Sequence, residues 1–221
     1  MYRGTFAIVD ERAIWHNVRQ IRSLLEPGKR LLIAVKANGY GHGALRAAEA
    51  ALSAGATDLG VASLEEALVL RKGGIAAPIL VLGVVSPEAA QLAANWQIAI
   101  ALADDWFELD LPLFDPPLHV HVKVDTGMNR LGFRSPDEVL GIIRWLQTRP
   151  DMELAGVFTH FAKADAKELD HAEAQMERFE QVLATLKNAG VHVPVVHAAN
   201  SAATLRRPDW HYDMVRVGIS A

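Results

Sequence analysis

The chain has 221 residues, of which 51% are hydrophobic and 22% are charged, and it contains no cysteine. This length suits one large domain or two small ones, and a long disordered stretch is not expected. The formal charge is −4, so the basic excess of a typical nucleic-acid-binding protein is missing. The lack of cysteine excludes disulfide scaffolds, thiolate metal sites and cysteine nucleophiles.

No apolar run reaches the roughly 18 residues of a membrane-spanning helix. The longest run, Ala76–Val85, is interrupted by Pro78 and Gly83. The N-terminal sequence MYRGTFAIVDERA brings acidic residues too early for a secretory signal. We therefore expect a cytoplasmic protein that binds neither membranes nor nucleic acids.

Short apolar runs alternate with amphipathic stretches along the chain. A strand over Thr5–Val9 comes first, followed by a helix with an apolar stripe from Ile14 to Leu25. Near-continuous Val, Ile, Leu and Ala content in the later runs is typical of parallel strands buried on both faces. These eight runs are Leu31–Ala37, Leu59–Ser63, Pro78–Gly83, Ile98–Ala103, Leu118–Asp125, Leu154–Phe161, Val193–Ala199 and Met214–Ile219.

Helix signals lie between the runs. Ser63–Glu66 and Ser135–Glu138 both match a capping box, and Ser86 followed by proline starts a further helix. A long helix is expected over Lys167–Ala189, ended by Gly190.

Eight strand–helix units in succession predict an α/β protein with a (β/α)₈ barrel of the TIM type, which usually takes about 250 residues. A doubly wound open sheet is the rival fold, but nothing here resembles its glycine-rich dinucleotide turn. We expect the barrel to cover residues 10–221 and to lack its last helix. Residues 1–9, with the short strand, are expected to pair outside the barrel.

Polar residues follow the C-terminal ends of five runs, where such barrels carry their catalytic groups. The first run ends in Lys36, and the glycines that follow it let the backbone approach a ligand closely. Tyr40 and His42 add polar groups among these glycines. A lysine amine in a desolvated barrel mouth can form a Schiff base with an aldehyde. A plain solvent-facing lysine is the alternative.

The fifth run places four polar residues on one face, and we expect His119, His121, Lys123 and Asp125 to point toward the barrel axis. A buried charge there must be paired or neutralised. Lys123 could pair with Asp125, or Asp125 with Arg130; alternatively, Lys123 could carry a carbamate. A purely structural polar plug is the remaining interpretation.

The last two strand ends suggest a phosphate site. Asn200 and Ser201 begin a short helix, and the Gly218 and Ile219 amides follow the eighth run. This is the usual phosphate position in barrels, although Asn and Ser at a helix start often only cap it.

Arg216 lies on the eighth run, where its side chain can only donate hydrogen bonds and stays protonated. A pyridine nitrogen facing it would remain an unprotonated acceptor, which weakens the ring as an electron sink. The alternative is a surface ion pair with Asp213.

Together these motifs resemble those of bacterial alanine racemases, in the family's order and over essentially the whole chain. They are AVKANGYGHG (34–43), KVDTGMNRLG (123–132), THFA (159–162), ANS (199–201) and VRVGI (215–219). The resemblance implies pyridoxal 5′-phosphate as the cofactor and the interconversion of L- and D-alanine, which supplies D-alanine for peptidoglycan.

The resemblance also implies roles for single residues. Lys36 would bind the cofactor aldehyde and act as the base for the D-enantiomer, and Arg216, supported by His160, would face the pyridine nitrogen. Arg130 would contact the cofactor's phenolic oxygen and the substrate carboxylate, with a carbamylated Lys123 orienting it. The residues expected to hold the phosphate are Tyr40, Asn200, Ser201, Gly218 and Ile219.

Members of that family continue into a β-rich domain, which supplies a second catalytic tyrosine across a homodimer interface. This chain ends before that domain, so we expect weak activity from it alone, and a separate C-terminal fragment is a conceivable partner.

Two other functions stay open. One is a non-catalytic barrel that binds pyridoxal phosphate. The other is a metal-dependent amidohydrolase-type barrel, disfavoured because His119 and His121 precede Lys123 on their strand and so lie below the mouth. No metal is expected. In the amidohydrolase alternative, the metal site would be assembled from His119, His121, Lys123, His160, His197 and Asp213.

Overall fold

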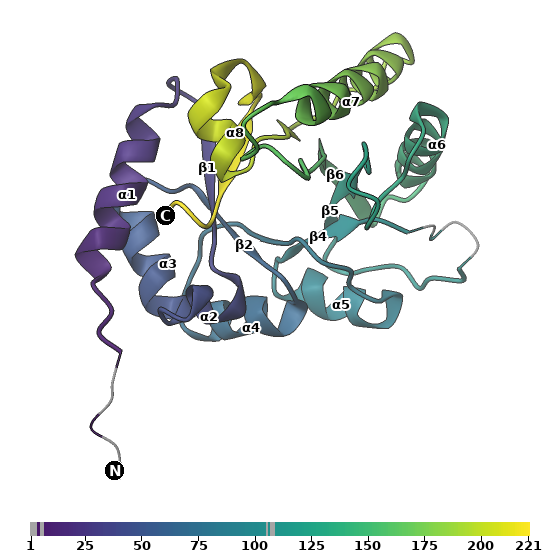
Figure 1. The fold of residues 1–221 in the computed structure, drawn as a ribbon. Coiled ribbons are helices and arrows are strands. Elements are labelled where there is room, and N and C mark those ends of the chain that lie inside the picture. The colour runs from purple at the N-terminus through teal and green to yellow at the C-terminus, as the bar shows by residue number, and fades with distance from the viewer. Residues whose placement is uncertain (1–3, 5–6, 105, 107–108) are drawn as a thin grey trace.

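The computed structural model describes residue 4, residues 7–104, residue 106 and residues 109–221. Parallel strands form a curved sheet with helices packed on its outside (Figure 1). The strands are β1 (Arg30–Ala34), β2 (Asp58–Val61), β3 (Ile79–Val81), β4 (Ala99–Leu102), β5 (Leu118–Lys123), β6 (Met152–Phe158), β7 (Val196–His197) and β8 (Met214–Val217). The helices are α1 (Glu11–Ser23), α2 (Lys36–Tyr40), α3 (Ala44–Ser53), α4 (Leu64–Lys72), α5 (Pro87–Asn95), α6 (Pro136–Gln147), α7 (Asp170–Asn188), α8 (Ser201–Arg206) and the 3₁₀ turn η1 (Pro208–Trp210).

The sheet closes on itself. Its eight strands run in the order β7-β6-β5-β4-β3-β2-β1-β8, so β1 pairs with both its successor and the last strand of the chain. Between β7 and β8, the Asp213 N–H donates to the Val196 carbonyl and the Arg216 N–H to the Ala199 carbonyl, each at 3.0 Å. The predicted barrel is confirmed, and the open doubly wound sheet is excluded.

Helix ends follow the sequence signals. Asp10 caps α1, whose buried stripe contains Ile14 and Val18, and the predicted capping box of α6 is complete. Gly190, with φ +73°, ends α7 as expected. The long helix starts three residues later than predicted, at Asp170. In the segment before it, the Arg206 guanidinium donates to the backbone carbonyls of Ala164, Ala166 and Lys167, which holds those residues in a loop.

The predicted N-terminal strand falls partly outside the described residues, which leave out Thr5 and Phe6. Ala7–Val9 form no strand, and the Ile8 side chain is exposed. Pairing of this segment outside the barrel stays a prediction. In the described part of the chain, no helix is both long and apolar enough to cross a bilayer.

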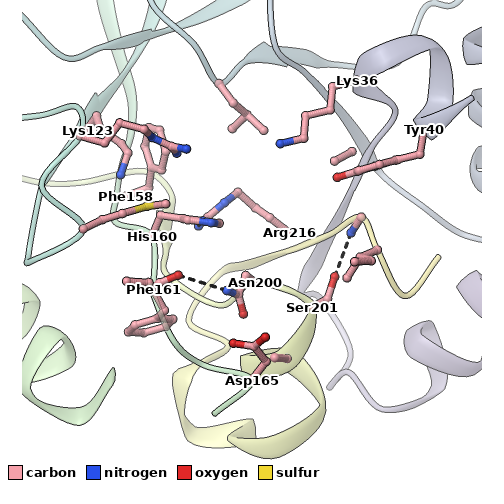
Figure 2. Close-up of a pocket in the computed structure, with 18 residues that line it drawn as sticks. Lys36, Tyr40, Lys123, Phe158, His160, Phe161, Asp165, Asn200, Ser201 and Arg216 are labelled. Carbon is pink, nitrogen blue, oxygen red and sulfur yellow. Dashed lines mark hydrogen bonds between the residues drawn. The ribbon is translucent and has the colours of Figure 1, made fainter. Parts of the chain in front are cut away.

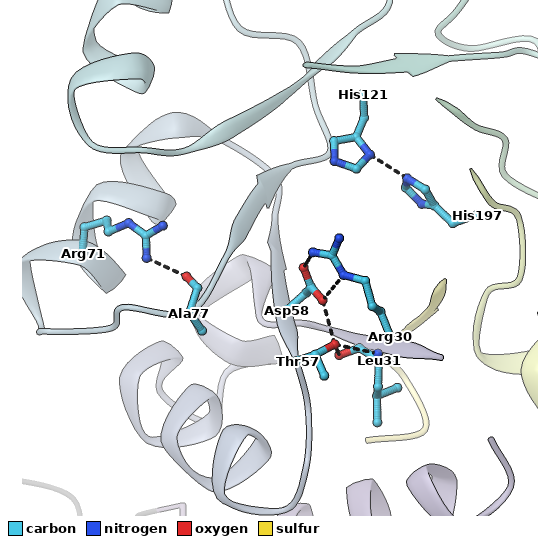
Figure 3. A network of polar contacts seen from close by, with 8 residues as sticks. All are labelled: Arg30, Leu31, Thr57, Asp58, Arg71, Ala77, His121 and His197. Atoms are coloured by element: carbon cyan, nitrogen blue, oxygen red, sulfur yellow. Dashed lines mark hydrogen bonds and ion pairs between the residues drawn. The ribbon is translucent and has the colours of Figure 1, made fainter. Parts of the chain in front are cut away.

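The inside of the barrel is more polar than its outside. Leu31 and Ile33 belong to the main core between sheet and helices, whereas Leu32 packs in a small separate cluster with Leu80 and Met214. Buried polar side chains occupy the remaining interior, and Figure 3 shows two of them, His121 and His197, bonded to each other. Barrel interiors are usually filled by branched apolar side chains, and buried polar groups such as these need hydrogen-bond partners.

Candidate active site

A cavity of about 340 Å³ opens at the C-terminal ends of the strands, within the size range of small-molecule sites. Side chains from β1, β5, β6, β8 and the loops after them converge on it (Figure 2). The ten residues to which the family resemblance gives a role all line this cavity. They are Lys36, Tyr40, Lys123, Arg130, His160, Asn200, Ser201, Arg216, Gly218 and Ile219.

The turn after β1 aims two of these residues. Ala37, Asn38, Gly39 and Tyr40 all have φ between 51° and 63°, so α2 is a left-handed turn. Non-glycine residues rarely take this conformation in succession, since each costs about 1–2 kcal/mol. The turn directs Lys36 and Tyr40 into the cavity, with the lysine Nζ 6.0 Å from the tyrosine ring centroid.

The left-handed turn does not consist of glycines alone. Three of the four left-handed residues carry side chains, and Gly39 is needed because a Cβ there would lie 3.1 Å from the Ala47 Cβ. His42, predicted as a polar group of the site, does not line the main cavity. Its Nδ1 lies 3.0 Å from the Gly39 carbonyl, so it supports the turn instead.

One corner of the cavity is lined with hydrogen-bonding groups. The Gly218 N–H donates to the Ser201 Oγ at 3.0 Å, and the Asn200 side chain caps α8 by accepting the Ala203 N–H at 3.0 Å. A Cβ added at Gly218 would lie 2.4 Å from the Tyr40 hydroxyl, so only glycine leaves the phenol this close to the β8 end. Burial raises the pKa of Tyr40, which keeps its hydroxyl protonated as a donor.

Arg216 lies at the floor of the cavity and is buried. Its guanidinium donates to the Thr159 and Ala198 carbonyls at 2.6 and 3.1 Å, and its Nη1 lies 2.9 Å from the His197 Nδ1. Burial lowers its pKa to about 9, so it remains charged at neutral pH. The surface pair with Asp213 does not form, because that carboxylate accepts the Val196 N–H.

Neutral histidines surround this arginine. Burial, with the charge of Arg216, lowers the pKa of His160 to about 3, and the same causes hold the pKa of His197 well below its ordinary value. His197 therefore accepts from Arg216 through Nδ1 and donates from Nε2 to the Nδ1 of His121, 2.9 Å away. Phe158 stacks on the His197 ring at a centroid distance of 4.7 Å. These contacts fix the arginine from below.

Lys123 is buried beside the cavity. Burial and the charge of Arg216 lower its pKa to about 7. It forms no ion pair with Asp125, whose carboxylate instead accepts four backbone N–H groups of residues 127–130. Burial alone raises the Asp125 pKa, but these donors outweigh it and lower the pKa below its ordinary value. Asp125 thus shapes the loop that presents Arg130 to the cavity.

The face predicted for β5 is partly correct. His121, Lys123 and Asp125 are buried, as expected of residues near the barrel axis. His119 is exposed and lies 3.4 Å from the Glu153 carboxylate, at the opposite end of the strand from the cavity. Among the described residues no cluster of three or more His, Asp or Glu is placed to hold a metal ion, so the geometry does not support the amidohydrolase alternative.

Sequence reasoning missed two polar residues whose hydrogen bonds hold segments next to the site. Gln175 of α7 is fully buried, accepts the Ala162 N–H at 2.9 Å and donates to the His160 carbonyl at 3.1 Å. Its sequence signal is a polar residue within the apolar stripe of a helix. The other is Glu66, which was interpreted only as half of a capping box.

The three neutral histidines predict acid-sensitive folding. In the unfolded chain His121, His160 and His197 take up a proton near pH 6.5. In the folded chain burial lowers the pKa of His121 and His160 to about 3 and that of His197 well below its ordinary value. The unfolded state therefore binds more protons in this range, and stability falls as the pH is lowered, by up to about 1.4 kcal/mol per histidine and pH unit. The measurement is the free energy of unfolding in urea at about pH 7.5 and at about pH 5.5. Replacing the exposed His171 with Gln should leave the slope unchanged, and equal stability at both pH values would contradict this prediction.

Comparisons with the sequences of known proteins point to one family. Residues 9–221 match the family described as "Alanine racemase, N-terminal domain". The chain is 45% identical to the alanine racemase of Geobacillus stearothermophilus over 99% of this chain and 56% of that protein. It is 46% identical to that of Symbiobacterium thermophilum over 99% of this chain and 58% of that protein. The chain therefore spans somewhat over half the length of these relatives.

Comparison with solved structures leads to the same family. The alanine racemase of E. faecalis superposes with a TM-score of 0.90 at 40% identity, covering 96% of this chain and 57% of that one. The alanine racemase of Bacillus anthracis with bound L-Ala-P gives a TM-score of 0.90 at 39% identity, covering 99% and 57%. From its sequence match, its barrel and its relatives, this chain belongs to the alanine racemase family.

Proposed function

We propose that the chain is the cofactor-binding barrel of an enzyme that interconverts L- and D-alanine. The observation that carries this proposal is the convergence of Lys36, a donor-lined corner and the buried Arg216 on one cavity. Pyridoxal 5′-phosphate is the cofactor of the alanine racemase family, and three features of the cavity test whether it fits.

The corner at Gly218 fits a phosphate. The Ser201 oxygen accepts the Gly218 N–H, so this hydroxyl keeps its own hydrogen to donate, and the Tyr40 hydroxyl and the start of α8 supply further donors. Asn200 and Ile219 line the same corner, and the Asp165 carboxylate lines the cavity on the side of Asn200 (Figure 2). We assign the phosphate to this corner.

Arg216 fits the ring nitrogen. Its guanidinium can only donate, its neighbour His160 is neutral, and among the described residues it forms no ion pair with a carboxylate. It would hold the pyridine nitrogen as an unprotonated acceptor. A weaker electron sink suits a reaction that needs only brief carbanion character at one carbon.

Lys36 fits the cofactor aldehyde, since its amine enters the cavity beside Tyr40 (Figure 2). When bound, pyridoxal phosphate supplies a conjugated ring that withdraws electrons from the α-carbon of an amino acid. The Lys36 amine would move the α-proton on one face of that carbon. We propose that it serves the D-enantiomer.

Arg130 would bind the substrate carboxylate and the phenolic oxygen, because its loop presents it at the cavity opposite Lys36. We propose that Lys123 orients it after reacting with CO₂. The neutral amine forms an N–C bond to CO₂ and releases a proton to water, leaving a carbamate anion. A pKa of about 7 provides the neutral amine, and a negative group between Arg130 and Arg216 would relieve their repulsion.

Racemisation also needs a proton group on the opposite face of the α-carbon. We propose that a β-rich C-terminal domain of a second subunit supplies it in a homodimer, whether joined to the barrel or added as a separate fragment. The D-alanine formed would serve peptidoglycan synthesis, and a cytoplasmic location stays a prediction.

The proposal is tested by titrating the chain with pyridoxal phosphate and following the α-proton of alanine in D₂O. Saturable binding, weakened by inorganic phosphate, together with deuterium uptake by alanine, is the expected result. Binding without any exchange would favour the alternative of a non-catalytic cofactor-binding barrel, and no binding would contradict the proposal.

Replacing Gly218 with alanine should weaken cofactor binding about tenfold or more. The new Cβ would lie 2.4 Å from the Tyr40 hydroxyl and push the phenol away from the phosphate corner. The measurement is the Kd for pyridoxal phosphate. Tyr40→Phe serves as the matched control, because it removes the hydroxyl but leaves the ring in its place. The Kd should rise more in Gly218→Ala than in Tyr40→Phe. An unchanged Kd in Gly218→Ala would remove Gly218 from the phosphate site.

A further inference from the structure

The Glu66 carboxylate joins the ends of β1 and β2. Its Oε1 accepts the Ala37 N–H at 2.7 Å, and its Oε2 accepts the Ala62 N–H at 2.8 Å. The last backbone bond between these strands runs from the Val35 N–H to the Gly60 carbonyl at 2.8 Å. Both amides thus lie just beyond the point where the two strands separate. Glu66 supplies the acceptors that the diverging backbones lack.

Helix capping does not explain this arrangement. The Ser63 Oγ accepts the Glu66 N–H, and Glu66 accepts the amide just before that serine. Glu138 of α6 likewise accepts the amide before its capping serine, and both its bonds stay at its own helix end. The second oxygen of Glu66 instead reaches a loop 29 positions away in the sequence.

Its target, Ala37, is the first residue of the left-handed turn. A turn with three non-glycine residues at positive φ persists only where the surroundings hold it. At its far end, the Asn38 Oδ1 accepts the Ala44 N–H at 2.9 Å. At its near end, Glu66 holds the peptide that joins Lys36 to Ala37, and so fixes the direction in which the lysine side chain leaves the backbone.

We propose that Glu66 is a positioning residue for Lys36, acting through the Ala37 amide. This role rests on the proposed function, because it concerns the delivery of the Lys36 amine to the cofactor aldehyde. Displacement of a reacting group by about 1 Å costs up to about 100-fold in rate. Loss of the Glu66 contact should therefore slow the reaction of Lys36 with pyridoxal phosphate.

The test compares Glu66→Gln with Glu65→Gln. Both residues lie in the first turn of α4, so both variants remove the same charge from the same helix end. We expect amide hydrogen exchange at Ala37 to accelerate at least about tenfold in Glu66→Gln, without cofactor present, and to stay unchanged in Glu65→Gln. The rate at which borohydride-fixed cofactor appears on Lys36 should fall about 10- to 100-fold in Glu66→Gln alone.

Glu66→Asp keeps the charge but is too short to span both amides, so it should show the same two changes. The proposal would be overturned if both Glu66 variants exchanged the Ala37 amide and labelled Lys36 at the rates of the wild-type chain. It would also be overturned if both variants failed to fold. Failure of the wild-type chain to label Lys36 would overturn the proposed function, and this role with it. Normal wild-type labelling with unaffected variants would overturn only the role of Glu66.

Discussion

Replacing Lys36 with alanine should abolish covalent attachment of pyridoxal phosphate to the chain. Lys36 lies two residues after the end of β1, and its amine points into the cavity (Figure 2). Lys123, the other lysine that lines the cavity, is buried, and its Nζ donates to the Val124 carbonyl at 3.5 Å. The variant should lose the absorbance of lysine-bound cofactor and all α-proton exchange of alanine.

The measurement is borohydride reduction followed by peptide mass mapping, with Lys163→Ala as the control. Lys163 is exposed and follows the same β6 strand end as His160, so its removal should leave labelling unchanged. A covalent label that persists at another lysine in the Lys36 variant would contradict the assignment. The cofactor should still bind non-covalently in that variant, because the phosphate corner is intact.

The 221-residue chain by itself should racemise alanine poorly while exchanging its α-proton. Lys36 reaches one face of the α-carbon, and a single base that returns its own proton regenerates the starting enantiomer. Among the described side chains that line the cavity, Tyr40 is the one phenol, and it stands at the phosphate corner. The absence of a positioned acid–base group costs about 10²–10⁴ in rate.

The experiment follows deuterium incorporation and optical inversion of alanine in parallel. The rate of deuterium incorporation should exceed the rate of optical inversion by about 10²-fold or more. A C-terminal domain from an alanine racemase, added in trans, should narrow this difference, and the Lys36→Ala variant supplies the background. Full racemase turnover by the chain alone would show that a second proton group lies within these residues and that the proposed site is wrong.

Much of this site could be predicted from sequence because barrel strands place their ends at one mouth. Lys36, His160 and Arg216 are polar residues at the ends of apolar runs, and that pattern alone brings them together. The distances and hydrogen bonds could not be predicted. The pattern leaves Arg216 open to a surface pair, whereas closure of the barrel buries it against the His197 ring.

Local patterns also hide contacts between distant segments. The Ser63–Glu66 and Ser135–Glu138 motifs look alike, yet Glu66 binds the turn after β1 because α4 starts beside it. The left-handed turn is equally hidden, since Ala37 and Asn38 carry no signal for positive φ as strong as that of glycine. Strand alternation predicted the inward face of β5 but could not tell that His119 lies at the opposite rim.

The measurement that tests the central claim most directly is the site of cofactor attachment in the wild-type chain. The chain is equilibrated with pyridoxal phosphate, reduced with borohydride, digested and mapped by mass spectrometry. A single adduct on the peptide containing Lys36, suppressed by excess inorganic phosphate, is the predicted result. No adduct, or one spread over exposed lysines and insensitive to phosphate, would contradict the account of this barrel as a pyridoxal-phosphate site.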